Sequence, residues 1–167
     1  MFDSYATGVS ADGSVIVGVA LNPGVTAFRW TASTGMIDLG NPPGGYLSEA
    51  FAITPDGRTV VGNAGVDGSF VPMIWDEAHG MRNLIEVFVE LGLGPSIAGW
   101  DLEEARAVSA DGLTVVGYGF NPAGEREGWI ADLRPASVVE VPTASTAALS
   151  ILASLIVGAA LLTMRLR

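Results

Sequence analysis

The chain repeats one nine-residue pattern three times, and this repeat limits what the chain can fold into. The copies read SADGSVIVG at 10–18, TPDGRTVVG at 54–62 and SADGLTVVG at 109–117. Each unit of a repeat protein buries its apolar face by stacking against its neighbours, so stability comes from the array rather than from one unit. We therefore expect an array of similar units rather than a single catalytic domain.

Each copy has the pattern of a β-hairpin. A short apolar stretch precedes an Asp-Gly pair, and a β-branched run such as 59–61 follows it. Glycine supplies the positive φ of a tight turn, and aspartate accepts hydrogen bonds from nearby backbone amides. The predicted turn residues are Asp12, Gly13, Asp56, Gly57, Asp111 and Gly112. The alternative role for the three aspartates is calcium binding, although each copy supplies one aspartate where calcium loops need several oxygen ligands.

The segments that follow the three copies also correspond to one another. They read AFRWTASTGMIDLG at 27–40, PMIWDEAHGMRNL at 72–84 and the shorter GWIADL at 128–133. Their alternation and turn residues predict two further strands in each unit. The unit starts are 44 and 55 residues apart, close to the roughly 40 to 50 residues of a four-stranded propeller blade. We predict an all-β, β-propeller-like repeat region over 1–135, with about three four-stranded blades at about 5–40, 50–84 and 105–133.

Three tryptophans occupy corresponding places when the units are aligned by this pattern. They are Trp30, Trp75 and Trp129. We predict that they fill the space between adjacent sheets, because a large ring buries the most area there. The alternative is a platform on which carbohydrate stacks. Trp100 lies outside the repeat and is the candidate for a surface aromatic residue.

The longer spacing between the second and third copies comes from an insertion with helical periodicity. Over 83–92, apolar residues recur at i, i+3, i+4 and i+7 with glutamates on the other side, which predicts a short amphipathic helix ending at Gly92. An acidic cluster follows, formed by Asp101, Glu103 and Glu104. We interpret it as a solvated face, and the alternative is a cation site.

Composition excludes several classes of function. All 18 acidic residues and six of the eight arginines lie at or before Glu140, which gives this part of the chain a formal charge of −12. Such a surface repels phosphate groups, so we expect no nucleic-acid partner. The chain has no cysteine and one histidine, His79, which excludes a thiol nucleophile and a histidine cluster for zinc. We predict no catalytic and no cofactor-binding residues, and interpret His79 as a turn residue.

The C-terminal segment has the character of a membrane anchor. The twenty residues of 145–164, STAALSILASLIVGAALLTM, carry no charge, and Arg165 and Arg167 follow them. A helix of this length crosses a hydrocarbon core of about 30 Å, and positive charge beside a span tends to stay cytoplasmic. We predict a linker at 136–144, a transmembrane helix at 145–164 and a basic stop at 165–167. The C-terminus would then be cytoplasmic and the repeats outside. The alternative is a buried helix of a soluble protein.

The start of the chain lacks the pattern of an export signal. Residues 1–13, MFDSYATGVSADG, lead straight into the first repeat, without the charged start, apolar stretch and cleavage site of a signal peptide. Three units are also fewer than the four to eight blades of a closed propeller. We expect a truncated start with further blades before Met1. The alternative is that the C-terminal segment alone directs membrane insertion.

The repeats resemble a known family. The pattern SADG-x-x-VVG, followed by AFRW and TGM-x-DLG, resembles the HAF repeat family of bacterial extracellular proteins over 5–133. This resemblance implies an exported surface protein with no assigned chemistry. The tail is similar to a PEP-CTERM sorting segment, which implies processing by an exosortase-type membrane enzyme. The sorting-like motif is Val141-Pro142, and it continues with Thr143-Ala144 where the family pattern has Glu-Pro.

Together these patterns predict a membrane-tethered protein of the cell surface with a structural or binding role. The expected partners are the membrane, extracellular polysaccharide or surface proteins. The first alternative is a hydrolase or lyase that acts on glycans with carboxylates from the acidic cluster. The second is an assembly subunit whose unpaired repeat edges bind another chain.

Overall fold

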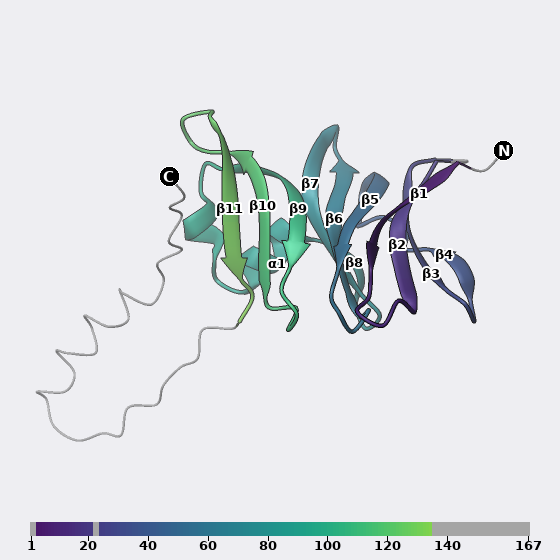
Figure 1. The fold of residues 1–167 in the computed structure, drawn as a ribbon. Coiled ribbons are helices and arrows are strands. Elements are labelled where there is room, and N and C mark those ends of the chain that lie inside the picture. The colour runs from purple at the N-terminus through teal and green to yellow at the C-terminus, as the bar shows by residue number, and fades with distance from the viewer. Residues whose placement is uncertain (1–2, 22–23, 135–167) are drawn as a thin grey trace, which may run out of the picture.

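The computed structural model describes residues 3–21 and 24–134, which form three antiparallel sheets (Figure 1). In each sheet the strands are adjacent in sequence order. The first sheet contains β1 (Ser4–Val9), β2 (Val15–Ala20), β3 (Thr26–Thr31) and β4 (Gly35–Asp38). The second contains β5 (Gly45–Ile53), β6 (Thr59–Val66), β7 (Ser69–Asp76) and β8 (Gly80–Asn83). The third contains β9 (Asp101–Val108), β10 (Thr114–Phe120) and β11 (Arg126–Asp132).

This arrangement confirms the predicted array of β-sheet units, with one difference in the third unit. Its sheet has three strands in the described part of the chain, where the sequence predicts four. The described residues contain no helix that is long and apolar enough to cross a membrane. The predicted linker, membrane span, basic stop and sorting-like motif lie outside the described residues.

The insertion between the second and third sheets forms helix α1 (Leu84–Glu90), followed by a 3-10 helix at Gly94–Ile97. Asn83 caps α1, because its side-chain oxygen accepts a hydrogen bond from the Ile85 amide at 3.0 Å. Gly92 follows the helix with a φ of 81°, as expected of a glycine that ends a helix. The helix buries its apolar side, formed by Leu84, Val87 and Phe88.

The sheets pack face to face, and each interface has its own apolar cluster. Between the first and second sheets, Val17 and Ala27 pack with second-sheet residues that include Val60 and Met73. Between the second and third sheets, the cluster combines residues of both sheets with α1, and its buried members are Val61, Ile74, Leu84, Val87, Phe88, Leu102, Ala105, Val115, Trp129 and Ala131. Neighbouring Val60 and Val61 therefore point to opposite sides of β6, as side chains in a strand must.

A β-bulge occurs at the same place in each unit, and its extra residue contacts a neighbouring sheet. The pairing of the first two strands shifts at Thr7, Phe51 and Arg106, which are the extra residues. The Thr7 hydroxyl donates to the Ala50 carbonyl of the second sheet at 2.7 Å. The Arg106 guanidinium of the third sheet lies 4.5 Å from the centre of the Phe51 ring. Thr7 and Phe51 thus contact the following sheet, and Arg106 contacts the preceding one.

The last glycine of the repeated pattern leaves room for this bulge. A Cβ atom added at Gly18, Gly62 or Gly117 would overlap a carbonyl oxygen of the first strand of the same sheet. At Gly62 it would also lie 2.9 Å from Cε of Met73. The pattern requires glycine here because the backbones approach too closely for any side chain.

Replacing this glycine should therefore destabilise the array. We expect Gly62→Ala to lower the free energy of unfolding by about 3 kcal/mol, the upper end of the usual cost of overpacking. Urea unfolding followed by circular dichroism measures the difference. Gly24→Ala is the control and should change stability by about 0.5 kcal/mol or less, because a Cβ there has no atom within 4 Å. Equal losses in the two variants would contradict this account.

Candidate functional site

The predicted Asp-Gly turns are held by a hydrogen-bond network that involves the first residue of each motif. In the first unit, the Ser10 hydroxyl donates to Asp12 Oδ1 at 2.6 Å and accepts from the Val15 amide at 3.0 Å. Asp12 Oδ1 also accepts from the Ser14 amide at 3.0 Å. The second and third units repeat these bonds through Thr54, Asp56, Ser109 and Asp111.

The turn glycines have the conformation that the sequence predicts. Gly13, Gly57 and Gly112 have φ values of 73°, 74° and 74°, a region that other residues rarely adopt. The three aspartates lie in three separate turns, one in each unit, and each accepts hydrogen bonds within its own turn. In the described part of the chain, no three His, Cys, Asp or Glu side chains lie close enough together to hold a metal ion.

The tryptophans do not occupy equivalent positions in the structure, and this corrects the sequence alignment. Trp30 pairs with Ile16, and Trp75 pairs with the corresponding Val60. Trp129 instead pairs with Gly117, two positions away from the expected partner. Trp129 is buried, whereas Trp30 and Trp75 are half-buried. The shorter third unit caused the error, because its tryptophan aligns with Phe28 and Met73.

A groove of about 350 Å³ lies where the first and second sheets meet. Arg29 lines it from β3 of the first sheet. The second sheet contributes the turn before β6 and the end of β7, with lining residues Gly57, Arg58, Thr59, Trp75, Asp76, Glu77 and Ala78. This mixture of two guanidinium groups, two carboxylates and one indole distinguishes the groove from the apolar clusters between the sheets.

Asp76 organises one end of the groove. Its Oδ2 atom accepts from the Arg82 guanidinium at 2.7 Å, and its Oδ1 atom lies 2.7 Å from Nδ1 of His79. Burial raises the pKa of Asp76, but hydrogen bonds from His79 and the charge of Arg82 outweigh this effect and hold the pKa below its usual range. Asp76 is therefore charged and holds Arg82 and His79 in place. His79 lies in the turn, as the sequence predicts.

Arg29 has unused hydrogen-bonding capacity at the groove. Its Nε atom is buried and has no hydrogen-bond partner among the described residues. A buried polar group without a partner costs stability, and such groups occur where a ligand or water completes the site. Arg29 occupies the strand position that Ile74 occupies in the second sheet, because they pair with the corresponding Val17 and Val61. Sequence alignment of the units could have revealed this arginine among apolar residues.

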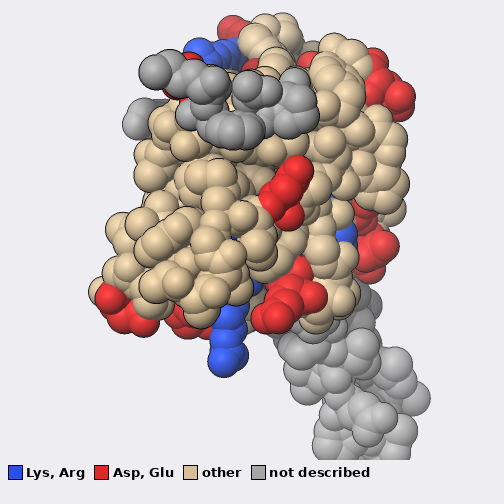
Figure 2. All heavy atoms as spheres, turned by 90° about the vertical axis from the view of Figure 1, so that its right-hand side faces the viewer, with Lys and Arg blue, Asp and Glu red and all other residues tan. Residues whose placement is uncertain are grey.

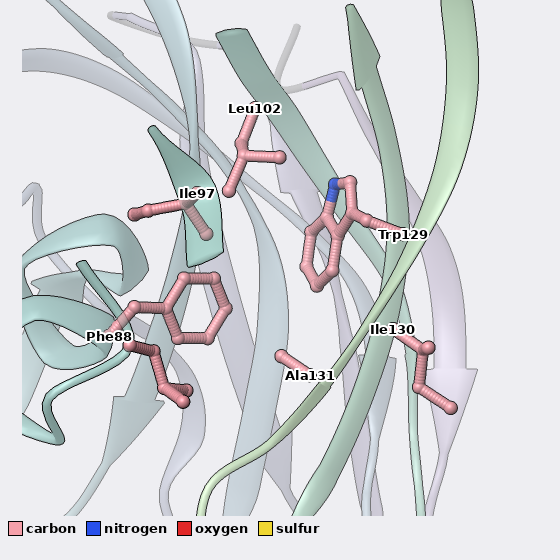
Figure 3. A pocket seen from close by; sticks show the side chains of 7 residues that line it. Phe88, Ile97, Leu102, Trp129, Ile130 and Ala131 are labelled. Carbon is pink, nitrogen blue, oxygen red and sulfur yellow. The ribbon is translucent and has the colours of Figure 1, made fainter. Parts of the chain in front are cut away.

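Between the second and third sheets, apolar side chains of α1 and β11 pack against each other. Figure 3 shows Phe88 of α1 directed toward Trp129 of β11, with the ring centres 5.8 Å apart and the rings nearly perpendicular. The remaining cavity is about 10 Å³ and is lined by apolar side chains, including Leu102 and Ile130. Helix α1 therefore fills this interface, and the groove beside Arg29 remains the larger of the two described spaces.

The acidic cluster lies in strand β9. Asp101 is exposed, whereas Glu103 and Glu104 are half-buried. Glu104 forms an ion pair with Arg106. Glu103 is the extra residue at a second irregularity in the pairing of β9 with β10, since Leu102 pairs with Gly119 and Glu104 with Tyr118. Trp100, the candidate surface aromatic, is half-buried against the cluster that includes α1.

Comparisons with known proteins support the fold. No family model matches the chain, and no curated protein matches it. TolB from Acinetobacter baumannii superposes with a TM-score of 0.54 and 18% identity over 79% of this chain and 30% of its own. The putative TolB from Agrobacterium tumefaciens superposes with a TM-score of 0.54 and 15% identity over 78% of this chain and 46% of its own. The chain thus spans less than half of either structure, and the likeness shows a β-propeller-like fold.

The turn network generates a prediction about acid stability. Hydrogen bonds from Ser10 and Ser14 lower the pKa of Asp12 from 3.8 to about 2. The folded state therefore holds this proton less tightly than the unfolded state does. The stabilising effect is present above the unfolded pKa of 3.8 and is lost as the pH falls toward 2. We expect Asp12→Asn to lower the melting temperature at neutral pH and to reduce its dependence on pH in this window.

Thermal unfolding at a series of pH values measures this effect. Asp101→Asn, a change at an exposed aspartate outside the turns, is the control and should keep the pH dependence of the wild type. The explanation fails if acidification lowers the melting temperatures of Asp12→Asn and of the wild type by the same amount.

Proposed function

We propose that this chain is an exported, membrane-tethered module of the cell surface that binds extracellular polysaccharide without catalysis. The observation that supports binding is the groove between the first and second sheets, where Arg29, Arg58 and Trp75 meet. It combines hydrogen-bond donors with an aromatic ring, whereas the other described cavity is small and apolar. Binding sites are concave, with a few placed polar groups beside apolar surface.

The chemistry of the groove favours an acidic polysaccharide. The indole of Trp75 offers an apolar surface for the C–H face of a sugar ring. Guanidinium groups bind carboxylates with two parallel hydrogen bonds. Arg29 has a buried donor without a partner among the described residues, and the Arg58 side chain is 86% exposed with its Nε atom 3.9 Å from Asp56. Arg58 is thus accessible to a ligand that carries carboxylates, and Arg29 lines the groove beside it.

The tethering part of the proposal rests on the sequence. The twenty uncharged residues of 145–164 precede two arginines, and the acidic residues all lie before this segment. This distribution favours insertion with the C-terminus in the cytoplasm and the repeats outside. The resemblance to the HAF repeat family and to PEP-CTERM segments adds export and an exosortase-type enzyme as the partner for processing.

Arginine substitution tests the binding site. We expect Arg58→Ala to weaken binding of polyuronate oligosaccharides about tenfold, because a hydrogen bond to a charged group contributes about 1.5 kcal/mol. Titration calorimetry of the full chain in detergent measures this, with neutral dextran oligosaccharides as the comparison ligand. Arg134→Ala is the matched control, since Arg134 is also exposed and paired with an aspartate two residues earlier. Equal affinities of the two variants would place the ligand elsewhere.

The same preparation tests the absence of catalysis. Oligosaccharides incubated with the full chain should keep their length in chromatography. Turnover that disappears in Glu103→Ala or Glu104→Ala would instead establish the glycan-cleaving alternative.

A charge in the middle of the tail tests the membrane tether. We expect Leu155→Arg to move the protein out of the carbonate-resistant membrane fraction, because a central arginine costs about 2.5 to 3.5 kcal/mol of insertion free energy. Ser145→Arg places the same charge at the end of the span and should leave the protein in the membrane fraction. Retention of both variants in that fraction would contradict a spanning segment.

A further inference from the structure

The chain contains four Asp-Gly dipeptides. Three of them form the turns of the repeated motif, and the fourth, Asp67-Gly68, connects β6 to β7. In an Asp-Gly dipeptide the glycine nitrogen can attack the aspartate side chain, because glycine has no side chain that blocks the approach. Whether a dipeptide reacts depends on two groups, which are the aspartate carboxyl group and the glycine amide.

In the three repeated turns both groups are held by hydrogen bonds. The glycine amide donates to the carbonyl of the first motif residue, as Gly13 does to Ser10 at 3.0 Å, and the other two units repeat this bond. The aspartate carboxylate accepts from the hydroxyl of that same residue and from a backbone amide two positions beyond the aspartate. These bonds lower the pKa of all three aspartates, which keeps each carboxyl group in its charged, unreactive form.

Asp67-Gly68 has neither restraint. Both residues are exposed. Within the part of the chain that the structure describes, the Asp67 carboxylate accepts no hydrogen bond and the Gly68 amide donates none. A Cβ added at Gly68 would have no atom within 4 Å. The side chain of Asp67 and the nitrogen of Gly68 are therefore free to approach each other.

The geometry of the turn explains this difference. Val66 pairs with Ser69 across the hairpin, so Asp67 and Gly68 are its two loop residues. Their φ values are 50° and 84°, and positive φ at both loop residues is typical of a type I′ turn. In such a turn the flanking residues make the hydrogen bonds of the ladder, which leaves the Gly68 amide without a role in the hairpin.

A comparison with the first repeated turn separates hydrogen bonding from crowding. A Cβ added at Gly13 also has no atom within 4 Å, so the surroundings of Gly13 and Gly68 are equally open. The two sites differ in that the Gly13 amide and the Asp12 carboxylate are both bonded. Hydrogen bonds, rather than the space around the glycine, therefore distinguish the two dipeptides.

We propose that Asp67-Gly68 is a site of spontaneous backbone modification, at which the aspartate converts through a cyclic succinimide into isoaspartate. The Gly68 nitrogen attacks Cγ of the protonated Asp67 carboxyl group. A C–N bond forms, and the carboxyl hydroxyl leaves with the amide proton as water. A second water molecule then adds to the main-chain carbonyl of the ring and breaks its bond to the Gly68 nitrogen, which regains a proton. The chain now continues through the side-chain carbonyl, and its mass is unchanged.

The modification affects the sheet on which both neighbouring sheets pack. Isoaspartate adds one methylene carbon to the backbone of a two-residue loop, and loop length sets the register of a hairpin. Strand β6 carries Val60 and Val61, which are buried on opposite sides of the second sheet. A change in the pairing of β6 with β7 therefore disturbs both interfaces, and the stability of the protein declines as the molecule ages.

This inference is independent of polysaccharide binding and of the membrane tether. The groove is lined by the turn before β6 and by the end of β7, whereas Asp67 lies at the opposite ends of these two strands. Loss of polysaccharide binding would therefore leave the inference unchanged.

Ageing of the full chain in detergent at weakly acidic pH, followed by digestion after arginine, tests the proposal. The digestion places the four Asp-Gly dipeptides in separate peptides, 1–29, 30–58, 59–82 and 107–126. Chromatographic retention and electron-transfer fragmentation identify isoaspartate in each. We expect at least about tenfold more isoaspartate in 59–82 than in any other peptide, because each unit by which hydrogen bonds lower a carboxyl pKa reduces its protonated fraction tenfold.

The same chain unfolded in urea is the control for local sequence. Each of the four aspartates precedes a glycine, so all four peptides should accumulate isoaspartate at similar rates once the turns are lost. In the folded chain, Ser10→Ala removes the hydroxyl that donates to Asp12 and should raise isoaspartate in 1–29 alone. If that variant fails to fold, the comparison of the folded and unfolded wild type still decides the proposal.

Asp67→Gly tests the consequence for stability. Glycine adopts positive φ readily, so the variant keeps the turn but has no side chain that can cyclise. After ageing, the wild type should have a lower melting temperature than a fresh sample, whereas aged Asp67→Gly should keep its melting temperature. Equal losses in the two proteins would exclude Asp67 as the cause.

Two results of the peptide analysis would overturn the proposal. One is a folded wild type in which 59–82 contains no more isoaspartate than the other three peptides. The other is a preference for 59–82 that persists unchanged in urea, which would assign the reaction to local sequence and not to the turn.

Discussion

The structure depends on one constraint, which is that the second sheet has two apolar faces and needs a neighbouring sheet on each. Val60 and Val61 are adjacent in β6 and fully buried, yet they belong to clusters on opposite sides of the second sheet. A sheet with one solvated face would alternate apolar and polar residues. The second sheet instead has continuous apolar and small residues, since a neighbouring sheet covers each side. No unit of this kind is stable alone, and its neighbours are part of its fold.

The residues of the repeated motif have three different structural roles. The first residue and the aspartate hold the turn, as Ser10 and Asp12 do through the hydroxyl and carboxylate. The turn glycine, such as Gly57, packs against the preceding unit where a side chain would overlap Val15. The last glycine, such as Gly62, lets the first two strands approach at the bulge. The motif is therefore conserved between units by packing and not by chemistry at an active site.

Local signals in the sequence were sufficient for the hairpins and for helix α1, because turn residues, caps and apolar spacing act over a few positions. Such signals did not predict which residue pairs with Trp129. The sequence alignment matched the tryptophan of GWIADL with that of AFRW, but tertiary packing selects a different strand register in the third sheet. The groove could not be predicted from local signals either. It depends on Arg29 from one sheet meeting Trp75 from the next, and no local pattern specifies which side chains two sheets bring together.

The two interfaces between the described sheets differ at one strand position and in an insertion, and this difference bears on where a ligand can bind. At the first interface Arg29 lines a polar groove, whereas at the second the corresponding Ile74 belongs to an apolar cluster with α1. The proposed polysaccharide site therefore depends on an arginine that the first of these two interfaces has and the second lacks.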